Sequence, residues 1–110
     1  MTLPHYENAY IDIAKLQEYC LNENHPRGKH KAIVFRRTLG ITGNEAIMLK
    51  NSIMQALQVS EASEIGQDKY GTRFSADLSV TINHRSAVVR TLWIIKHDET
   101  FPRLITAYVK

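Results

Sequence analysis

The 110-residue sequence contains only one cysteine, and this scarcity excludes two kinds of stabilisation. A lone Cys20 can form neither an internal disulfide nor a cysteine-based zinc site. Because Cys20 lies in an apolar helical pattern, we expect a buried thiol in a protein of a reducing compartment. The chain must fold on its own hydrophobic core, which its length and a hydrophobic content of 44% allow.

Long apolar segments are absent as well. The first residues mix Pro4, His5, Glu7 and Asn8 with no apolar run, so they do not resemble a secretory signal peptide. No later segment approaches the length of a transmembrane helix. We therefore expect a cytoplasmic protein with no membrane partner.

Several catalytic motifs are also missing. The sequence has no glycine-rich phosphate loop, no nucleophile elbow and no HExxH helix. The only close pair of metal ligands is His25 and His30, whose spacing places them on different faces of a helix, beside cations that would repel a metal ion. Acidic residues are scattered, and Asp77, the one carboxylate inside a predicted strand, is interpreted as solvent-facing. We expect neither a metal site nor a cofactor.

Length and charge set two further limits. A chain of 110 residues is expected to form a single domain over residues 1–110. The net charge of +3 and the isoelectric point near 9.1 are mildly basic, so they are compatible with a nucleic-acid partner without requiring one. The positions of the charges are therefore more informative than their sum.

The hydrophobic period is helical in the first half and alternating in the second. This change predicts an α+β fold in which about three N-terminal helices pack on a C-terminal antiparallel sheet of three to four strands. Helices are expected over residues 12–21, 28–39 and 42–60. Their expected caps and stops are Asp12, Asn22, Gly40 and a Thr42–Glu45 capping box. Their predicted core residues are Ile13, Leu16, Cys20, Ala32, Phe35, Leu39, Leu49, Ile53, Ala56 and Leu57.

Three strands are predicted in the second half. Residues 61–70 are polar and are expected to form a connecting loop. Residues 73–82 alternate cleanly and predict a strand covered on one face, residues 87–96 form a nearly apolar central strand, and a turn over residues 83–86 joins them into a hairpin. The last strand is expected over residues 103–109. Leu104, Thr106 and Tyr108 are expected to share one face of it, and the predicted inward positions of the first strand are Phe74, Ala76, Leu78, Val80 and Ile82.

Residues 25–31, here called the basic cluster, place two histidines and three cationic side chains within seven positions. Imidazole can transfer protons near neutral pH, and lysine and arginine bind anions, so the cluster indicates chemistry or binding at a phosphate. A solvated loop that happens to be basic is the simpler interpretation. The cluster leads directly into the second predicted helix, which carries Arg37.

Cations, histidines and hydroxyls together fit metal-free RNA cleavage. The 2′-hydroxyl of RNA is an internal nucleophile, so an enzyme needs a base, a cation for the phosphorane charge and an acid for the leaving oxygen. The predicted catalytic residues are His30, Arg37, Arg73, Thr106 and Tyr108. The predicted RNA- or phosphate-binding residues are His25, Arg27, Lys29, Lys31, Arg90 and Arg103.

Structural roles compete with these assignments. An arginine in a strand, such as Arg73, is often paired with a carboxylate, whereas Arg90 interrupts an apolar strand, which is costlier and so more informative. Thr106 and Tyr108 are good strand formers on propensity alone. Trp93 is most simply a core residue.

The chain also resembles a bacterial family of domains of unknown function over nearly its whole length. Members occur as small free-standing proteins, often encoded beside another small protein, and as C-terminal modules of polymorphic toxins. The residues that carry this resemblance are Leu3-Pro4, Ala9, Asp12, Lys15-Leu16, Leu21-Asn22, residues 25–32, Phe35, Leu39-Gly40, residues 70–74, residues 91–94 and residues 103–109.

A looser resemblance concerns the mechanism. Helices followed by an antiparallel sheet, with a final strand that reads Thr106-Ala107-Tyr108, are similar to the barnase, EndoU, colicin and RelE-like ribonuclease superfamily. Its toxin members use His, Arg, Thr and Tyr in the cleft, and Val109 stands where many of them have proline. This resemblance implies a metal-free endoribonuclease toxin that a small cognate antitoxin or immunity protein neutralises.

Two other functions remain open at this point. A non-catalytic RNA- or protein-binding module of such a pair would use the same cationic face, and the chain could form a homo-oligomer. An antitoxin or immunity protein is the third interpretation, although such proteins tend to be acidic. Growth arrest on expression without the neighbouring protein would separate a toxin from the other two.

Overall fold

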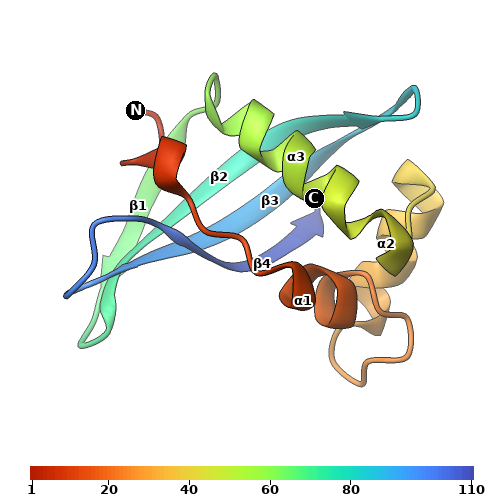
Figure 1. Ribbon diagram of the computed structural model, residues 1–110, viewed down its shortest axis with the longest axis horizontal. Helices are drawn as coiled ribbons and strands as arrows, with labels where there is room; N and C mark the ends of the chain where they lie inside the picture. Colours follow the sequence, from red (N-terminus) through yellow and green to blue (C-terminus); the bar gives the residue numbers. More distant parts are fainter.

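The computed structural model describes residues 1–110 and has the α+β architecture expected from the sequence (Figure 1). Short helices and turns come first and a four-stranded sheet follows. The elements are η1 (Tyr6–Asn8), α1 (Ile13–Lys15), η2 (Leu16–Cys20), α2 (Lys29–Leu39), η3 (Gly43–Glu45), α3 (Ala46–Leu57), β1 (Ala62–Gln67), β2 (Gly71–Ile82), β3 (Arg85–Lys96) and β4 (Arg103–Val109).

The first predicted helix is interrupted by a wide turn. Asp12 caps it as expected, because its side chain accepts a hydrogen bond from the backbone N–H of Ala14. However, α1 ends at Lys15, and η2 is a single π-helical turn in which the N–H of Leu21 donates to the carbonyl of Leu16. Apolar residues four positions apart fit either kind of helix, so the sequence pattern could not distinguish them.

The second and third predicted helices are confirmed. In α2, Gly40 ends the helix in the left-handed region with a φ of 70°. The Thr42–Glu45 capping box is present, although its first turn is the 3-10 turn η3 and α3 proper begins at Ala46. The predicted core positions of these helices are buried, apart from Ala56, which is partly buried.

The four strands form one antiparallel sheet in the order β1-β2-β3-β4. Strand β1 lies within residues 61–70, so the prediction of a loop there was wrong. It is an edge strand in which only Ala62 is buried, and a bulge between Glu64 and Gly66 disturbs its register with β2. A strand exposed on both faces does not need alternating apolar residues, which explains why the pattern did not reveal it.

The predicted hairpin is formed by β2 and β3. Its turn is shorter than expected, because only Asn83 and His84 lie between the strands and both have positive φ, 50° and 69°. This geometry is typical of a two-residue type I′ turn. All five predicted inward residues of β2 are buried, and Trp93 of β3 is fully buried, as expected.

Strand β4 differs from its prediction in the faces of its side chains. Leu104 pairs with Trp93 and Thr106 pairs with Leu92, so Ile105 is an extra residue in the ladder. This bulge places Leu104 on the core face but turns Thr106 and Tyr108 to the opposite face, so the three residues do not share one face as predicted.

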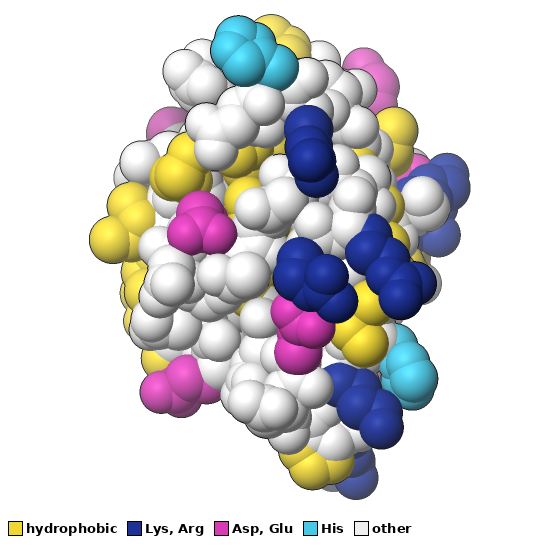
Figure 2. All heavy atoms as spheres, turned by 90° about the vertical axis from the view of Figure 1, so that its right-hand side faces the viewer, with side chains coloured by type: hydrophobic (Ala, Val, Ile, Leu, Met, Phe, Trp, Pro, Cys, Tyr) yellow, Lys and Arg dark blue, Asp and Glu magenta, His cyan; other side chains and the backbone are white.

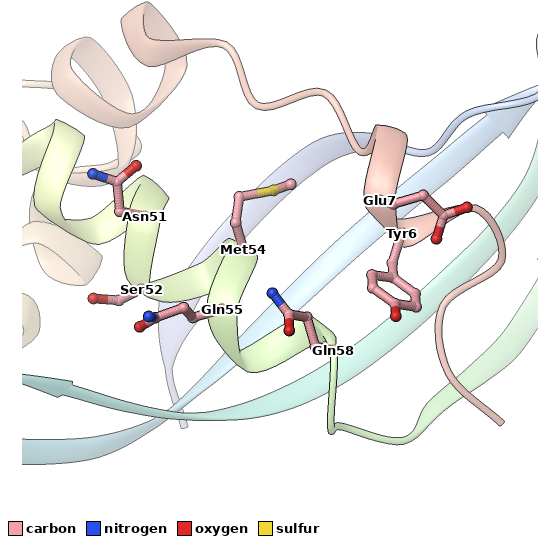
Figure 3. A pocket seen from close by; sticks show the side chains of 7 residues that line it. All are labelled: Tyr6, Glu7, Asn51, Ser52, Met54, Gln55 and Gln58. Carbon is pink, nitrogen blue, oxygen red and sulfur yellow. The ribbon is translucent and has the colours of Figure 1, made fainter.

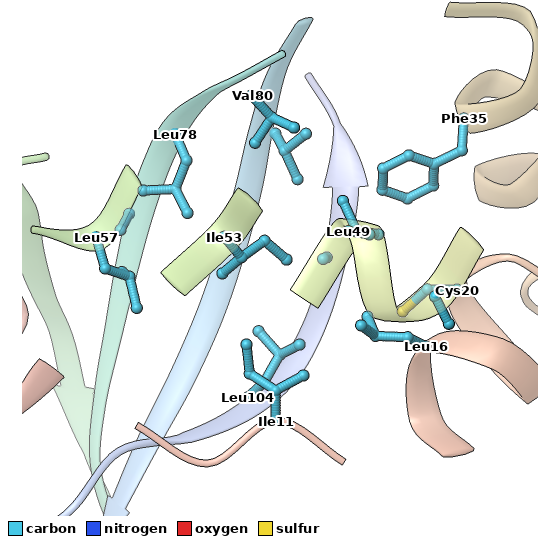
Figure 4. Close-up of a cluster of buried hydrophobic side chains, with 14 of the residues drawn as sticks. Ile11, Leu16, Cys20, Phe35, Leu49, Ile53, Leu57, Leu78, Val80 and Leu104 are labelled. Carbon is cyan, nitrogen blue, oxygen red and sulfur yellow. The ribbon is translucent and has the colours of Figure 1, made fainter. Parts of the chain in front are cut away.

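The core lies between the helices and one face of the sheet (Figure 4). Helix α3 crosses this face over β2, and α2 and η2 lie against β4 (Figure 1). Within the core, the indole N–H of Trp93 donates to the Thr91 hydroxyl, which donates to the carbonyl of Ala76, both at 2.8 Å. No helix is both long and apolar enough to cross a membrane.

Candidate active site

A lysine without an acidic partner lies where α2 meets β4. The ammonium of Lys31 donates to the hydroxyls of Tyr19, at 3.5 Å, and Thr106, at 3.4 Å. It also lies 5.2 Å from the centre of the Tyr19 ring and 5.3 Å from that of the Tyr108 ring. We call Tyr19, Lys31, Thr106 and Tyr108 the Lys31 cluster. Its residues come from η2, α2 and β4.

The electrostatics of this cluster favour an anion. Lys31 is half-buried, and no carboxylate lies within salt-bridge distance of its ammonium. Cation–π contacts reduce the cost of this arrangement but do not neutralise the charge. Because the oxygens of Tyr19 and Thr106 accept from Lys31, their own protons stay free to donate to a bound anion. A phosphate oxygen is a ligand of suitable charge.

Local structure holds each member of the cluster in place. The π-helical turn η2 presents Tyr19 while its neighbour Cys20 is fully buried, with its sulfur 4.0 Å from the Thr106 hydroxyl. The bulge in β4 turns Thr106 and Tyr108 away from the core. Two irregularities of the backbone therefore build the cluster, which fits the frequent occurrence of π-turns and bulges at functional sites.

His25 extends the cluster through Tyr19. The two rings stack at 4.8 Å between centroids and 5° between planes. Nδ1 of His25 accepts hydrogen bonds from the backbone N–H groups of Arg27 and Gly28, both at 3.0 Å. Nδ1 must therefore carry a lone pair, so the proton of the neutral ring lies on Nε2, which is free to donate.

Gly28 allows the basic cluster to approach η2. A Cβ at this position would lie 2.4 Å from the carbonyl oxygen of Tyr19, although the backbone conformation itself, with a φ of −91°, suits any residue. We expect Gly28→Ala to lower the free energy of unfolding by about 1–3 kcal/mol in urea titrations, because backbone must move.

The matched control for this variant is Gly43→Ala. A Cβ at Gly43 would meet only atoms of Gln17, at 3.4 Å, and no strained φ is involved. Its effect should stay within about 0.5 kcal/mol. Equal stability of the two variants would show that the basic cluster does not pack on Tyr19 as described.

The arginines predicted in the strands are all paired with carboxylates. Arg73 contacts Asp68 at 2.9 Å. Arg103 forms two hydrogen bonds with Glu99, at 2.8 and 2.7 Å, which hold the pKa of that carboxyl below its usual range. Their charges are therefore less available to a phosphate than that of Lys31.

Arg90 is paired as well, but it lies beside the cluster. It forms two hydrogen bonds with Asp77, at 2.8 and 3.0 Å, and Lys110 adds a third at 2.9 Å. The Arg90 guanidinium, followed by Lys110, holds the pKa of Asp77 well below its usual range. Asp77 in turn raises the pKa of Arg90, with a smaller effect from the neighbouring Tyr108 hydroxyl. The interpretation of Asp77 as merely solvent-facing was incomplete.

The remaining predicted catalytic residues, His30, Arg37 and Arg73, are not part of the Lys31 cluster. No hydrogen bond, ion pair or cation–π contact joins His30, Arg37 or Arg73 to Thr106 or Tyr108. Arg27, Lys29, His30 and Arg37 are exposed. Figure 2 shows the end of the molecule that carries α2 and the β2–β3 turn, where basic side chains gather around an acidic one. The structure thus brings Lys31, Thr106, Tyr108 and, through Tyr19, His25 together, with Arg90 beside them.

Comparison with known proteins identifies the family. The model of a family described as "Domain of unknown function (DUF6883)" matches residues 2–110. The chain belongs to the DUF6883 family. Neither the curated proteins nor the solved structures contain a match to it.

Tyr19 is the residue of this DUF6883 domain that sequence reasoning missed. It lies next to Cys20 in a segment interpreted only as a core helix. The one available signal is that Tyr19 falls outside the apolar stripe of Leu16 and Cys20, so its ring and hydroxyl had to face something else.

The largest pocket of the DUF6883 domain lies away from the Lys31 cluster, between η1 and α3 (Figure 3). It measures about 620 Å³, and amide and hydroxyl groups dominate its lining. The lining residues are Tyr6, Glu7, Asn51, Ser52, Met54, Gln55 and Gln58. No cation and no histidine reaches it, so its chemistry does not match that of a phosphate site. We therefore base the functional argument on the cluster and not on pocket size.

Proposed function

We propose that this protein is a metal-free endoribonuclease, the toxin of a toxin–antitoxin or toxin–immunity pair, with its active site at the Lys31 cluster and His25. The observation that carries the proposal is the ammonium of the half-buried Lys31, which has hydroxyls and aromatic rings as its neighbours but no carboxylate within salt-bridge distance. Such a cation can stabilise the extra negative charge that develops on a phosphate during cleavage.

RNA is the substrate that best suits this set of groups. Its 2′-hydroxyl loses a proton to a base and attacks the adjacent phosphorus, the 5′-oxygen leaves with a proton from an acid, and a 2′,3′-cyclic phosphate remains. No water or metal ion is required for this step. Lys31 is assigned to the phosphorane charge. The hydroxyls of Tyr19 and Thr106 would donate hydrogen bonds to the same oxygens.

The general acid and base of the proposed reaction are groups that surround Lys31. The candidates are Nε2 of His25 and the phenols of Tyr19 and Tyr108, because each carries an exchangeable proton beside the cation. Arg90, which Asp77 fixes in place, adds positive charge next to Tyr108. The roles predicted for His30, Arg37 and Arg73 stay predictions. Contact with bound substrate is the role open to the exposed side chains of His30 and Arg37.

The toxin assignment rests on the resemblance to domains found free-standing and at the ends of polymorphic toxins. Under this proposal the protein acts on RNA in the cytoplasm. A small antitoxin or immunity protein would neutralise it by covering the end of the molecule shown in Figure 2, where positive charge gathers. An acidic partner surface would suit that face.

A non-catalytic RNA-binding module is the second candidate. One observation favours it: Nδ1 of His25 accepts two backbone hydrogen bonds, so one of the two imidazole nitrogens is committed to the loop. A phosphate could still bind at Lys31 without any bond being broken.

The two candidates predict different products. The purified protein should cleave single-stranded RNA in excess EDTA and leave 2′,3′-cyclic phosphate ends, and a 2′-deoxy nucleotide at the cleavage position should block the reaction. Expression without its partner should arrest growth. Bound but intact RNA would support the module, whereas RNA neither bound nor cleaved would refute both candidates.

A further inference from the structure

A second set of side chains continues from the Lys31 cluster along the edge of β4. One pocket of about 420 Å³ is lined by Asp12, Lys15, Tyr19 and His25 among others, and a second of about 240 Å³ is lined by Tyr10, Asp12, Lys15 and Arg103 among others. Because both pockets include Asp12 and Lys15, they adjoin. We call the combined depression the β4 groove.

The β4 groove contains lysines that form no salt bridge. Lys15 and Lys96 line it, and neither forms a salt bridge. Two carboxylates also line it. Asp12 caps α1 through the N–H of Ala14, and Glu18 lies at the end nearest His25. Lysines without partners therefore follow one another from Lys31 past Lys15 to the far end of the groove.

An exposed aromatic ring stands at that far end. Tyr10 is 47% exposed although backbone hydrogen bonds hold it on both sides, from its own N–H to the carbonyl of Pro102 at 2.8 Å and from the N–H of Leu104 to its carbonyl at 3.0 Å. The guanidinium of Arg103 lies 5.1 Å from the centre of its ring. An exposed ring on a fixed backbone loses little entropy when a flat partner stacks on it.

We propose that a single-stranded RNA segment binds along the β4 groove, with its reacting phosphate at Lys31, flanking phosphates at Lys15 and Lys96, and a base stacked on Tyr10. This proposal rests on the proposed function, which it deepens by naming an extended single strand as the substrate. Alternating cations and aromatic rings are how proteins hold single strands without reading sequence. A double helix would not expose a base to Tyr10.

The test separates the groove from the catalytic centre. Binding of a fluorescein-labelled single-stranded RNA of about ten nucleotides is measured by anisotropy at several salt concentrations, and cleavage of a dinucleotide is measured separately. The variants are Tyr10→Leu, which keeps apolar bulk, and Lys15→Gln. Lys50→Gln is the matched control, because Lys50 lies on α3, forms no salt bridge and lines neither pocket of the groove.

Both groove variants should bind the long RNA about 5- to 50-fold more weakly. Lys15→Gln should also reduce the slope of log affinity against log salt by about 0.7. Dinucleotide cleavage should not change, because a dinucleotide cannot span the groove. The control should match the wild type in every measurement.

Three results would overturn the groove proposal. They are unchanged long-RNA affinity in both groove variants, an equal loss for the dinucleotide, and polyglutamate competing as well as RNA of equal charge. The last result would assign the groove to an acidic peptide. If the wild type binds long RNA in the groove but cleaves none, the groove proposal survives and the proposed endoribonuclease function fails.

Discussion

Lys31→Met should lower the rate of RNA cleavage by about 10²–10³-fold, the loss typical of removing one preorganised group that stabilises transition-state charge. Methionine keeps the unbranched stem of lysine and removes only the ammonium that contacts Tyr19 and Thr106. Single-turnover cleavage with excess protein measures the chemical step. Growth arrest on expression should disappear in the same variant.

Two variants on the same helix serve as controls. Lys29→Met removes an exposed lysine from the same helical turn, and His30→Ala removes the exposed histidine that the sequence favours as base or acid. Both should cleave within a few-fold of the wild type if Lys31 is the centre. Loss of cleavage in His30→Ala with normal cleavage in Lys31→Met would instead support the assignment made from sequence.

His25→Asn should lower cleavage by about 10²-fold or more if this imidazole transfers a proton. The side-chain oxygen of asparagine can occupy the position of Nδ1, so the hydrogen bonds from Arg27 and Gly28 should persist. Nε2, the only ring nitrogen available to substrate, is lost. The thermal unfolding midpoint should stay close to that of the wild type.

The pH dependence of cleavage adds a second measurement for His25. A group that transfers a proton leaves its own limb in the pH–rate profile, and that limb should vanish in His25→Asn. Normal cleavage with an unchanged profile would restrict His25 to shaping the loop. An unstable variant would show that asparagine does not replace Nδ1, and His25→Gln, which can place a polar atom near Nε2, would then decide the question.

The sequence predicted the fold where hydrophobic periodicity carries the information. Helices α2 and α3, the inward face of β2 and the burial of Trp93 all depend on apolar residues that must leave water, and all were found where expected. Strand β1 was missed because its exposed edge position makes no demand on apolar spacing. Fold class depends on which residues are buried, and the spacing of apolar residues in a sequence indicates this well.

The candidate site could be predicted only in part. The types of residue were evident, but their grouping depended on backbone irregularities that no periodicity reveals. The bulge at Ile105 decides that Thr106 faces away from Leu104, and the π-helical turn brings Tyr19 beside Lys31. Pairing of a strand arginine with a carboxylate was foreseen as an alternative, but the partners of Arg73, Arg90 and Arg103 were hidden, because they lie up to 13 positions away in the chain.

The bulge at Ile105 also couples the strand residues of the Lys31 cluster to the hydrophobic core. Ala107 is fully buried between Thr106 and Tyr108, so the strand that presents both hydroxyls also fills the interior. Regular pairing of the same sequence without the bulge, with Ile105 retained in the ladder, would exchange these roles and place the hydroxyls inside. The register of β4 is thus constrained both by the hydroxyls on one face and by the buried Ala107 on the other. Changes of length that shift this register would be tolerated far less than changes in the surrounding loops.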